Sequence, residues 1–205
     1  MKSKFISLIS VLSALSVVIF ACSSTPSTEA AHTELPQSND AQPTAATEST
    51  ALPNDSGIKD IQTYPDRMEY HDHVKVVPTP TGDLPPVFGA HFASWQNCGI
   101  YDQPVELGDA LHSLEHGAVW LTYRSDLPKD QVTELQNLAQ GHGYVLMSPY
   151  VLQKSDVVLT AWGVQLVIDS LPDDRIGPFI AFYEQGPQNP EPGAPCDGAI
   201  GSPIK

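Results

Sequence analysis

Hydrophobic residues in the second half of the chain occur in short runs that predict β-strands. β-branched and aromatic side chains are frequent in these runs, and turn-forming residues lie between them. The last two runs flank Trp162 and Gly163, which indicates a hairpin or a bent strand. The runs that predict strands are 74–77, 118–123, 144–147, 157–161 and 164–168.

Apolar residues recur at helical spacing in three other segments, 105–116, 128–140 and 175–183. Gly117 and Gly141 follow the first two segments and suit the position after a helix end. The second segment lies between two predicted strands, so we expect a parallel strand pair joined by a crossover helix. Together these patterns predict an α+β fold, a single domain with a small mixed β-sheet and about three helices.

The N-terminal pattern indicates export. Lys2 and Lys4 precede an apolar run over 5–20, which is typical of a secretory signal. The run ends at Ala21-Cys22 and resembles a bacterial lipoprotein signal, which implies a signal peptide over 1–21 and a lipid on Cys22. The alternative is an ordinary signal peptide followed by a chance cysteine. We therefore expect an exported protein, lipid-anchored to the periplasmic or cell-surface face of the membrane.

The segment after Cys22 differs in composition from the rest. Residues 22–57 are rich in Ser, Thr, Ala and Pro and contain no aromatic residue, Lys or Arg, which predicts a disordered tether. Residues 58–205 carry all three Trp and all seven Tyr, so the core is expected there, in one domain.

The charge balance excludes one class of partner. Acidic residues outnumber basic residues by 24 to 10, and the net charge is −14. Nucleic-acid binding needs a basic patch or stripe, and the sequence has none. We therefore exclude nucleic acid as a partner.

Two cysteines remain if Cys22 is lipidated. Cys98 and Cys196 would then lie in an oxidising compartment, where such a pair usually forms a disulfide. Closing a loop of roughly a hundred residues contributes about 4–5 kcal/mol in the chain-entropy model. The bond would also hold the Gly- and Pro-rich segment 186–203. The alternative is that Cys98 serves as a thiolate ligand near the histidines.

Three motifs resemble the DUF3105 family, a domain of unknown function found in exported bacterial and archaeal proteins. The motifs are Pro85-Pro86-Val87-Phe88-Gly89-Ala90-His91, Gly99-Ile100-Tyr101-Asp102-Gln103-Pro104-Val105 and Leu111-His112-Ser113-Leu114-Glu115-His116-Gly117. Further matches lie at 145–150, 160–163 and 186–187, so the resemblance covers most of 74–187. The family tends to carry a histidine before the Pro-Pro turn, and His73 matches it best, with His71 as its rival. The resemblance implies a domain and no particular activity.

The histidine spacing predicts a metal site. His112 and His116 are four residues apart on a predicted helix, so their side chains share one face. His91 follows a glycine-containing turn, and His73 lies further upstream. Two imidazoles at a helix C-terminus can also serve only to cap it, but four histidines exceed that need. We predict His91, His112 and His116 as ligands, with His73 as a weaker candidate.

The donor types indicate which metal is bound. Imidazoles suit zinc, copper or nickel, and a thioether adds affinity for copper, above all Cu(I). Met147 ends a predicted strand beside 118–123, so we add Met147 to the candidate ligands and expect copper, with zinc as the alternative. Glu115 is expected to accept a hydrogen bond from a ligand imidazole without touching the metal. We predict a protein that binds, buffers or delivers copper, with membrane redox or copper-handling proteins as partners.

Two other functions remain open. The sequence His-x-x-Glu-His over 112–116 matches an inverted zinc-protease signature, in which Glu115 would be the general base and Glu184 the third ligand. Alternatively, a lipid-anchored domain of this kind would serve as a structural or accessory subunit of a membrane complex. The sequence leaves open whether any reaction is catalysed.

Overall fold

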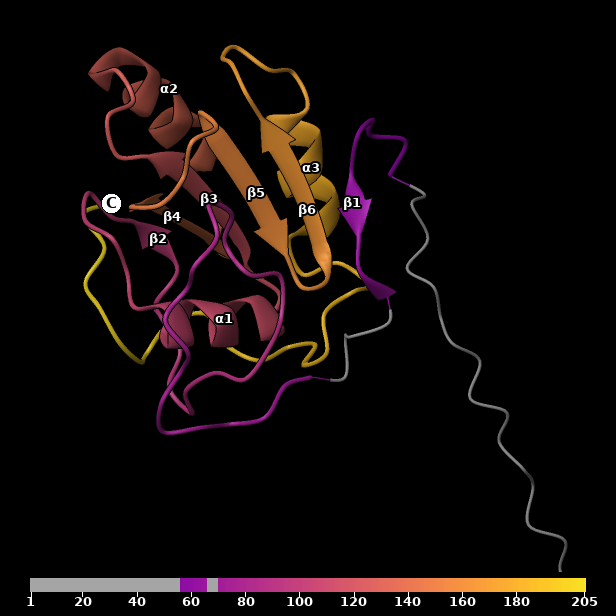
Figure 1. Cartoon of the computed structure of the whole chain (residues 1–205). Coiled ribbons are helices and arrows are strands. Elements are labelled where there is room, and N and C mark those ends of the chain that lie inside the picture. Colours follow the sequence, from indigo (N-terminus) through magenta and orange to yellow (C-terminus); the bar gives the residue numbers. More distant parts are fainter. Residues whose placement is uncertain (1–55, 66–69) are drawn as a thin grey trace, which may run out of the picture. The chain divides into compact units, whose positions relative to one another are not determined.

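Six strands form one mixed sheet in the part of the chain that the computed structural model describes, residues 56–65 and 70–205. Their order across the sheet is β1-β6-β5-β3-β4-β2 (Figure 1). β3 pairs in parallel with β4, which in turn pairs in parallel with β2, whereas the other pairs are antiparallel. The strands are β1 (Gln62–Thr63), β2 (Gly99–Ile100), β3 (Val119–Arg124), β4 (Val145–Tyr150), β5 (Val157–Ala161) and β6 (Val164–Ile168).

Helices cover both faces of this sheet. α1 (Leu107–Glu115) packs on one face, and α2 (Lys129–Ala139) and α3 (Ile176–Tyr183) pack on the other. In Figure 1, α3 lies behind β6 and α1 lies across the lower end of the sheet. Helices on both faces leave neither side of a central strand exposed to solvent. This explains why every residue of β4 and β5 is buried.

Alternation along the strands assigns their side chains to two separate cores. Trp120 and Leu146 face α1, and Leu121 and Met147 face α2 and α3. Successive side chains of a strand point to opposite faces. The first core also contains Ala110, Leu111, Leu114 and Trp162, and the second contains Leu159, Leu166, Ile176, Phe179 and Ile180.

The predicted α+β class is confirmed: the described residues form three helices and a mixed sheet in one unit. The predicted parallel pair around a crossover helix is β3-α2-β4, and the predicted hairpin is β5-β6. The predicted strand at 74–77 was wrong. Val76 is exposed there, and the chain pairs only through an isolated bridge between His73 and His91, away from the sheet.

Several expectations concern residues outside the described part. The predicted signal peptide (1–21), the lipidation of Cys22 and nearly all of the predicted tether (22–57) lie outside it. Within residues 56–65 and 70–205, no helix has the length and apolar character needed to span a membrane.

Candidate metal centre

The centre is built around the C-terminal end of α1. Gly117 follows the helix with φ +96°, and its N–H donates to the Leu114 carbonyl while Ala118 donates to the Ser113 carbonyl. This pair of bonds is a Schellman motif, which ends a helix at a glycine. His112 thus lies in the last turn, and His116 is the C-cap residue. Both imidazoles are almost fully buried.

A loop before α1 brings His91 to the same place. Phe92 donates its N–H to the Gly108 carbonyl, and Gln96 donates to the Asp109 carbonyl, so this loop lies directly on the helix. A side chain at Gly108 would collide with the Phe92 ring, so the close approach requires glycine. His91 itself is 0% exposed.

Three of the imidazoles are oriented in the same way. In each, Nδ1 lies within hydrogen-bond distance of a backbone carbonyl, which can only accept, so Nδ1 carries the proton. The carbonyls are those of Gly89 for His91 (2.8 Å), Phe92 for His112 (2.8 Å) and Pro195 for His116 (2.6 Å). Nε2 is left as the coordinating atom when the ring is neutral, and such carbonyl contacts are how proteins orient metal-ligating histidines.

The rings converge with a fourth imidazole, that of His73. The ring centroids of His73 lie 5.0 Å from His91 and 4.8 Å from His112, and those of His91 and His112 are 4.8 Å apart. His73 is held there by the bridge, in which Val74 donates to the His91 carbonyl. Ligand atoms of His73, His91, His112 and Glu115 all lie within 4.8 Å of one another.

Glu115 and His91 form a close, buried ion pair whose two facing atoms have no other polar partner. Nε2 of His91 lies 2.7 Å from Oε2 of Glu115, whose side chain is 1% exposed. Neither atom has a further hydrogen-bond partner. The other oxygen, Oε1, lies 3.1 Å from Nδ1 of His71. Each of the two atoms therefore depends on the other alone, and both face the space between the rings where a ligand would bind.

The pKa values of the buried groups are shifted in different directions. Burial lowers the pKa of His91, but the Glu115 carboxylate and the Gly89 carbonyl outweigh it, and the pKa lies above its ordinary value. Burial also raises the pKa of Glu115, but the neighbouring histidines reverse this, and that pKa is lowered. Burial and the nearby His116 lower the pKa of His112, which favours the neutral imidazole that a metal requires.

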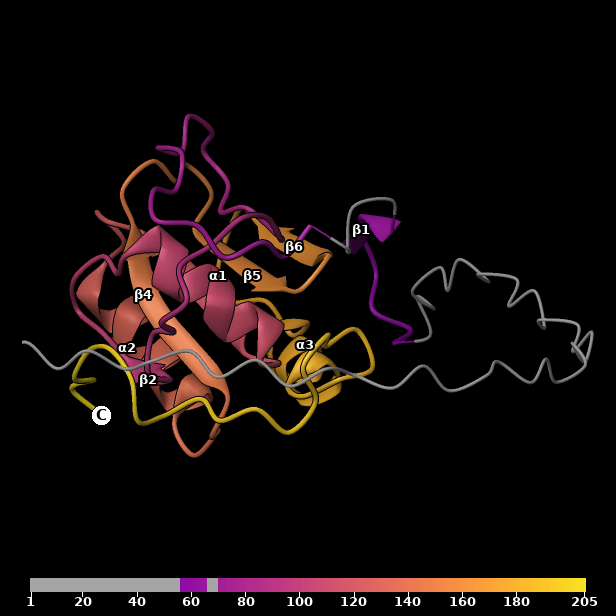
Figure 2. The ribbon, with the colours of Figure 1, turned by 90° about the horizontal axis from the view of Figure 1, so that it is seen from below.

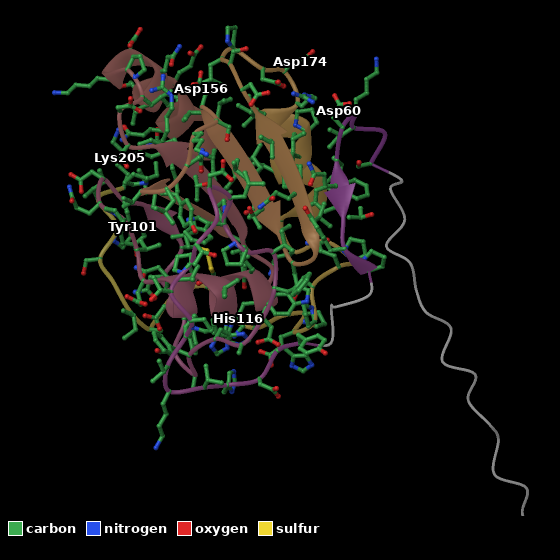
Figure 3. All side chains as sticks on the ribbon, in the orientation of Figure 1. Asp60, Tyr101, His116, Asp156, Asp174 and Lys205 are labelled. Atoms are coloured by element: carbon green, nitrogen blue, oxygen red, sulfur yellow. A yellow bond between two sulfur atoms is a disulfide. The ribbon has the colours of Figure 1, made fainter. Side chains whose placement is uncertain are left out.

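The C-terminal tail, residues 184–205, closes the end of α1. Gln185 donates its N–H to the Gly117 carbonyl, and Glu191 donates to the Glu115 carbonyl. The Glu191 carboxylate oxygen Oε2 lies 3.3 Å from Nε2 of His116. Ligand atoms of His112, His116 and Glu191 lie within 4.8 Å of one another and form a second group. Figures 1 and 2 show this tail, in yellow, passing α1, and Figure 3 places His116 at that helix.

The structure brings most predicted site residues together. His73, His91 and His112 meet in one group, and His116 lies next to it, with its ring centroid 4.5 Å from that of His112. Glu115, predicted to accept a hydrogen bond from a ligand imidazole, has Oε2 2.7 Å from Nε2 of His91, and a Glu115 oxygen also belongs to the group of possible ligand atoms. The predicted disulfide joins Cys98 to Cys196, with the Cα atoms 5.3 Å apart, so Cys98 is not a thiolate ligand.

Two predicted ligands lie elsewhere. Met147 is fully buried in the core under α2 and α3, on the sheet face opposite α1, so its inclusion among the ligands is corrected. Leu146 occupies the side facing α1 instead. Glu184, the third ligand of the protease alternative, has its oxygens 2.6 Å from His142 and 2.8 Å from the Tyr144 N–H. Neither candidate ligand group in the described residues includes Glu184.

Sequence reasoning missed Glu191 as a candidate ligand. Glu191 lies in a tail without helical or strand periodicity, where one acidic residue looks like any other. The available signal was the disulfide, because a bond from Cys196 to Cys98 returns this tail to the loop that carries His91.

Comparison with known proteins adds the family and nothing about activity. No curated protein and no solved structure matches the chain. Residues 80–198, which include the predicted ligands except His73, match the family model described as protein of unknown function (DUF3105). Since that match covers more than half of the chain, the protein belongs to the DUF3105 family.

Proposed function

We propose that this protein binds a transition-metal ion through His73, His91, His112 and Glu115, and that it holds or delivers the ion without transforming a substrate. The observation that carries the proposal is the convergence of Nε2 of His91 and Oε2 of Glu115, which have no other partner, with imidazoles whose Nδ1 atoms contact carbonyls. A cation bound between the rings would contact both atoms and would also take up the imidazole nitrogens around them.

The donor set supports copper(II) or zinc. Imidazole nitrogens and a carboxylate oxygen suit both ions, and the Irving–Williams order ranks copper(II) higher for such a set. The earlier reason for Cu(I), a thioether, does not apply because Met147 faces the other core. We therefore propose copper(II) as the preferred ion, with zinc as the competitor.

Location is proposed from the N-terminal sequence and the disulfide. A structural disulfide is typical of an oxidising compartment, and Cys98–Cys196 agrees with export. A lipid on Cys22 would hold the domain at the outer face of a membrane, where membrane redox or copper-handling proteins would be its partners. Hydrolysis is less well supported, because Glu115 is itself a candidate ligand and Glu184 contacts His142.

Metal analysis tests the proposal. The full chain, purified without a nickel column and stripped with a chelator, is dialysed against copper(II) or zinc, and bound metal and melting temperature are measured. We expect tight binding and a higher melting temperature, because a ligand that binds only the folded state stabilises it. His91→Gln and His73→Ala should weaken binding, whereas His142→Gln, outside both ligand groups, should not.

His73→Ala keeps the test decisive if His91→Gln does not fold, because His73 is exposed and contributes nothing to either core. A wild-type protein that binds neither ion and melts at an unchanged temperature would contradict the proposal.

A further inference from the structure

We infer that the centre holds two metal ions, the second bound by His112, His116 and Glu191. This inference rests on the proposed function for its first ion. Two ligand groups share His112, whose Nδ1 faces the Phe92 carbonyl, so only Nε2 remains to coordinate. One imidazole nitrogen binds one ion, so two ions must divide the ligands between them.

The division that follows is even. His73, His91 and Glu115 remain for the first ion, and His112, His116 and Glu191 serve the second. Each ion then receives two imidazole nitrogens and one carboxylate, with open positions for water or a ligand from a partner. Paired ions in proteins lie about 3.5–4 Å apart, and the short distances within the two groups are compatible with such a pair.

The tail is fastened so that Glu191 stays at this position. The backbone N–H of Glu191 donates to two acceptors, the Glu115 carbonyl at 3.2 Å and Oδ1 of Asn189 at 2.9 Å. The Asn189 side chain also donates to the His116 carbonyl at 3.3 Å. The Pro195 carbonyl contacts Nδ1 of His116, and the disulfide at Cys196 follows immediately. The same segment therefore supplies a ligand and orients another.

Charge favours a second cation here. The carboxylates of Glu115 and Glu191 give one negative charge to each ion. The end of α1 adds the negative pole of the helix dipole, which stabilises cations near the last turn. The repulsion between two close divalent ions is thereby reduced.

Stoichiometry tests the inference. The stripped full chain is titrated with copper(II) and with zinc, followed by dialysis and elemental analysis. We expect two ions per wild-type chain and one in Glu191→Gln. The affinity for the second ion should fall by at least the roughly 10–100-fold that even an outer-shell change costs. Asp197→Asn, an exposed carboxylate of the same tail outside both ligand groups, is the matched control and should retain two.

Paramagnetic resonance of the copper(II) form gives an independent reading. Two nearby copper(II) ions should give a magnetically coupled spectrum in the wild type and a single-ion spectrum in Glu191→Gln. One ion per wild-type chain, or two ions unaffected by Glu191→Gln, would overturn the inference and leave the first site standing. No bound ion at all would overturn the proposed function itself.

Discussion

The two faces of the sheet are built in different ways. The face under α2 and α3 is closed by apolar side chains that come from regular helices and strands. On the α1 side, irregular segments bring His73, His91 and Glu191 to the helix end, and a disulfide fastens the tail. The first face is closed by a hydrophobic core alone, whereas the second combines a hydrophobic core with the candidate metal centre.

The difference matters because regular elements fix their own side chains, whereas irregular segments need separate anchors. Leu121 and Met147 are placed by strand alternation alone. His91 requires a bridge to His73, a contact with the Gly89 carbonyl and the close approach at Gly108. Changes at those anchors should therefore alter metal binding more than changes within the regular core.

The largest effect is expected from removing the disulfide. The double change Cys98→Ser with Cys196→Ser reopens a loop with a sequence separation of 98 residues. It should reduce the free energy of unfolding by about 4–5 kcal/mol, measured by urea denaturation. It should also reduce the affinity for the second ion more than the affinity for the first. Glu191 and the Pro195 contact to His116 both belong to the second position, and both depend on the tail. An equal loss of affinity for both ions would contradict the proposed division of the ligands between them.

The next effect concerns the opposite core. Met147→Ala should reduce the free energy of unfolding by about 2–5 kcal/mol, because the side chain is fully buried and leaves a cavity. Met147→Leu conserves volume and should cost less than about 1.5 kcal/mol. Calorimetric titration of Met147→Leu should give the wild-type metal affinity. A lower copper affinity in that variant would restore the thioether as a ligand.

A pair of glycines compares the two faces directly. Gly117 and Gly141 follow α1 and α2 with φ of +96° and +92°. Alanine at either should cost about 1–2 kcal/mol for the left-handed backbone. At Gly117 the added Cβ would also lie 2.6 Å from Nδ2 of Asn189, whereas nothing lies within 4 Å at Gly141.

Gly117→Ala should therefore lower the melting temperature more than Gly141→Ala, and only Gly117→Ala should weaken the second ion. The same metal titration of both variants checks this, and equal effects would show that the contact with Asn189 does not hold the tail.

The smallest effect is a pH dependence of the chelator-treated protein. The pKa of His91 is raised, so its contribution to stability is complete below 6.5 and is lost as the pH rises through the folded value. The pKa of Glu115 is lowered, so its contribution is complete above 4.5 and is lost as the pH falls through the folded value. The pair should therefore stabilise the metal-free fold most between these two pH values.

Urea denaturation of wild type and Glu115→Gln at several pH values isolates the contribution of the His91–Glu115 pair to the free energy of unfolding. The lowered pKa of His112 makes both proteins lose stability as the pH falls below 6.5, so the difference between them is the informative quantity. That difference should be largest between 4.5 and 6.5. A difference that does not vary with pH would contradict the ion pair. Because a proton competes with the metal at His91, metal affinity should also fall on acidification.

The amino-acid sequence by itself determined the regular part of this protein. Periodicity and turn residues predicted the β3-α2-β4 crossover, the β5-β6 hairpin and all three helices, because these depend on local spacing. The i,i+4 spacing of His112 and His116 and the disulfide partners were also readable from the chain.

Tertiary structure decided which other side chains join these two histidines. The face of β4 that meets α1 belongs to Leu146, so Met147 is excluded from the centre. Glu191 and His73 reach the centre through backbone hydrogen bonds to α1 and to His91, which depend on long-range folding and leave no periodic signal. The physical reason is that local spacing fixes the direction of side chains within an element, whereas the meeting of separate segments depends on how the whole chain packs.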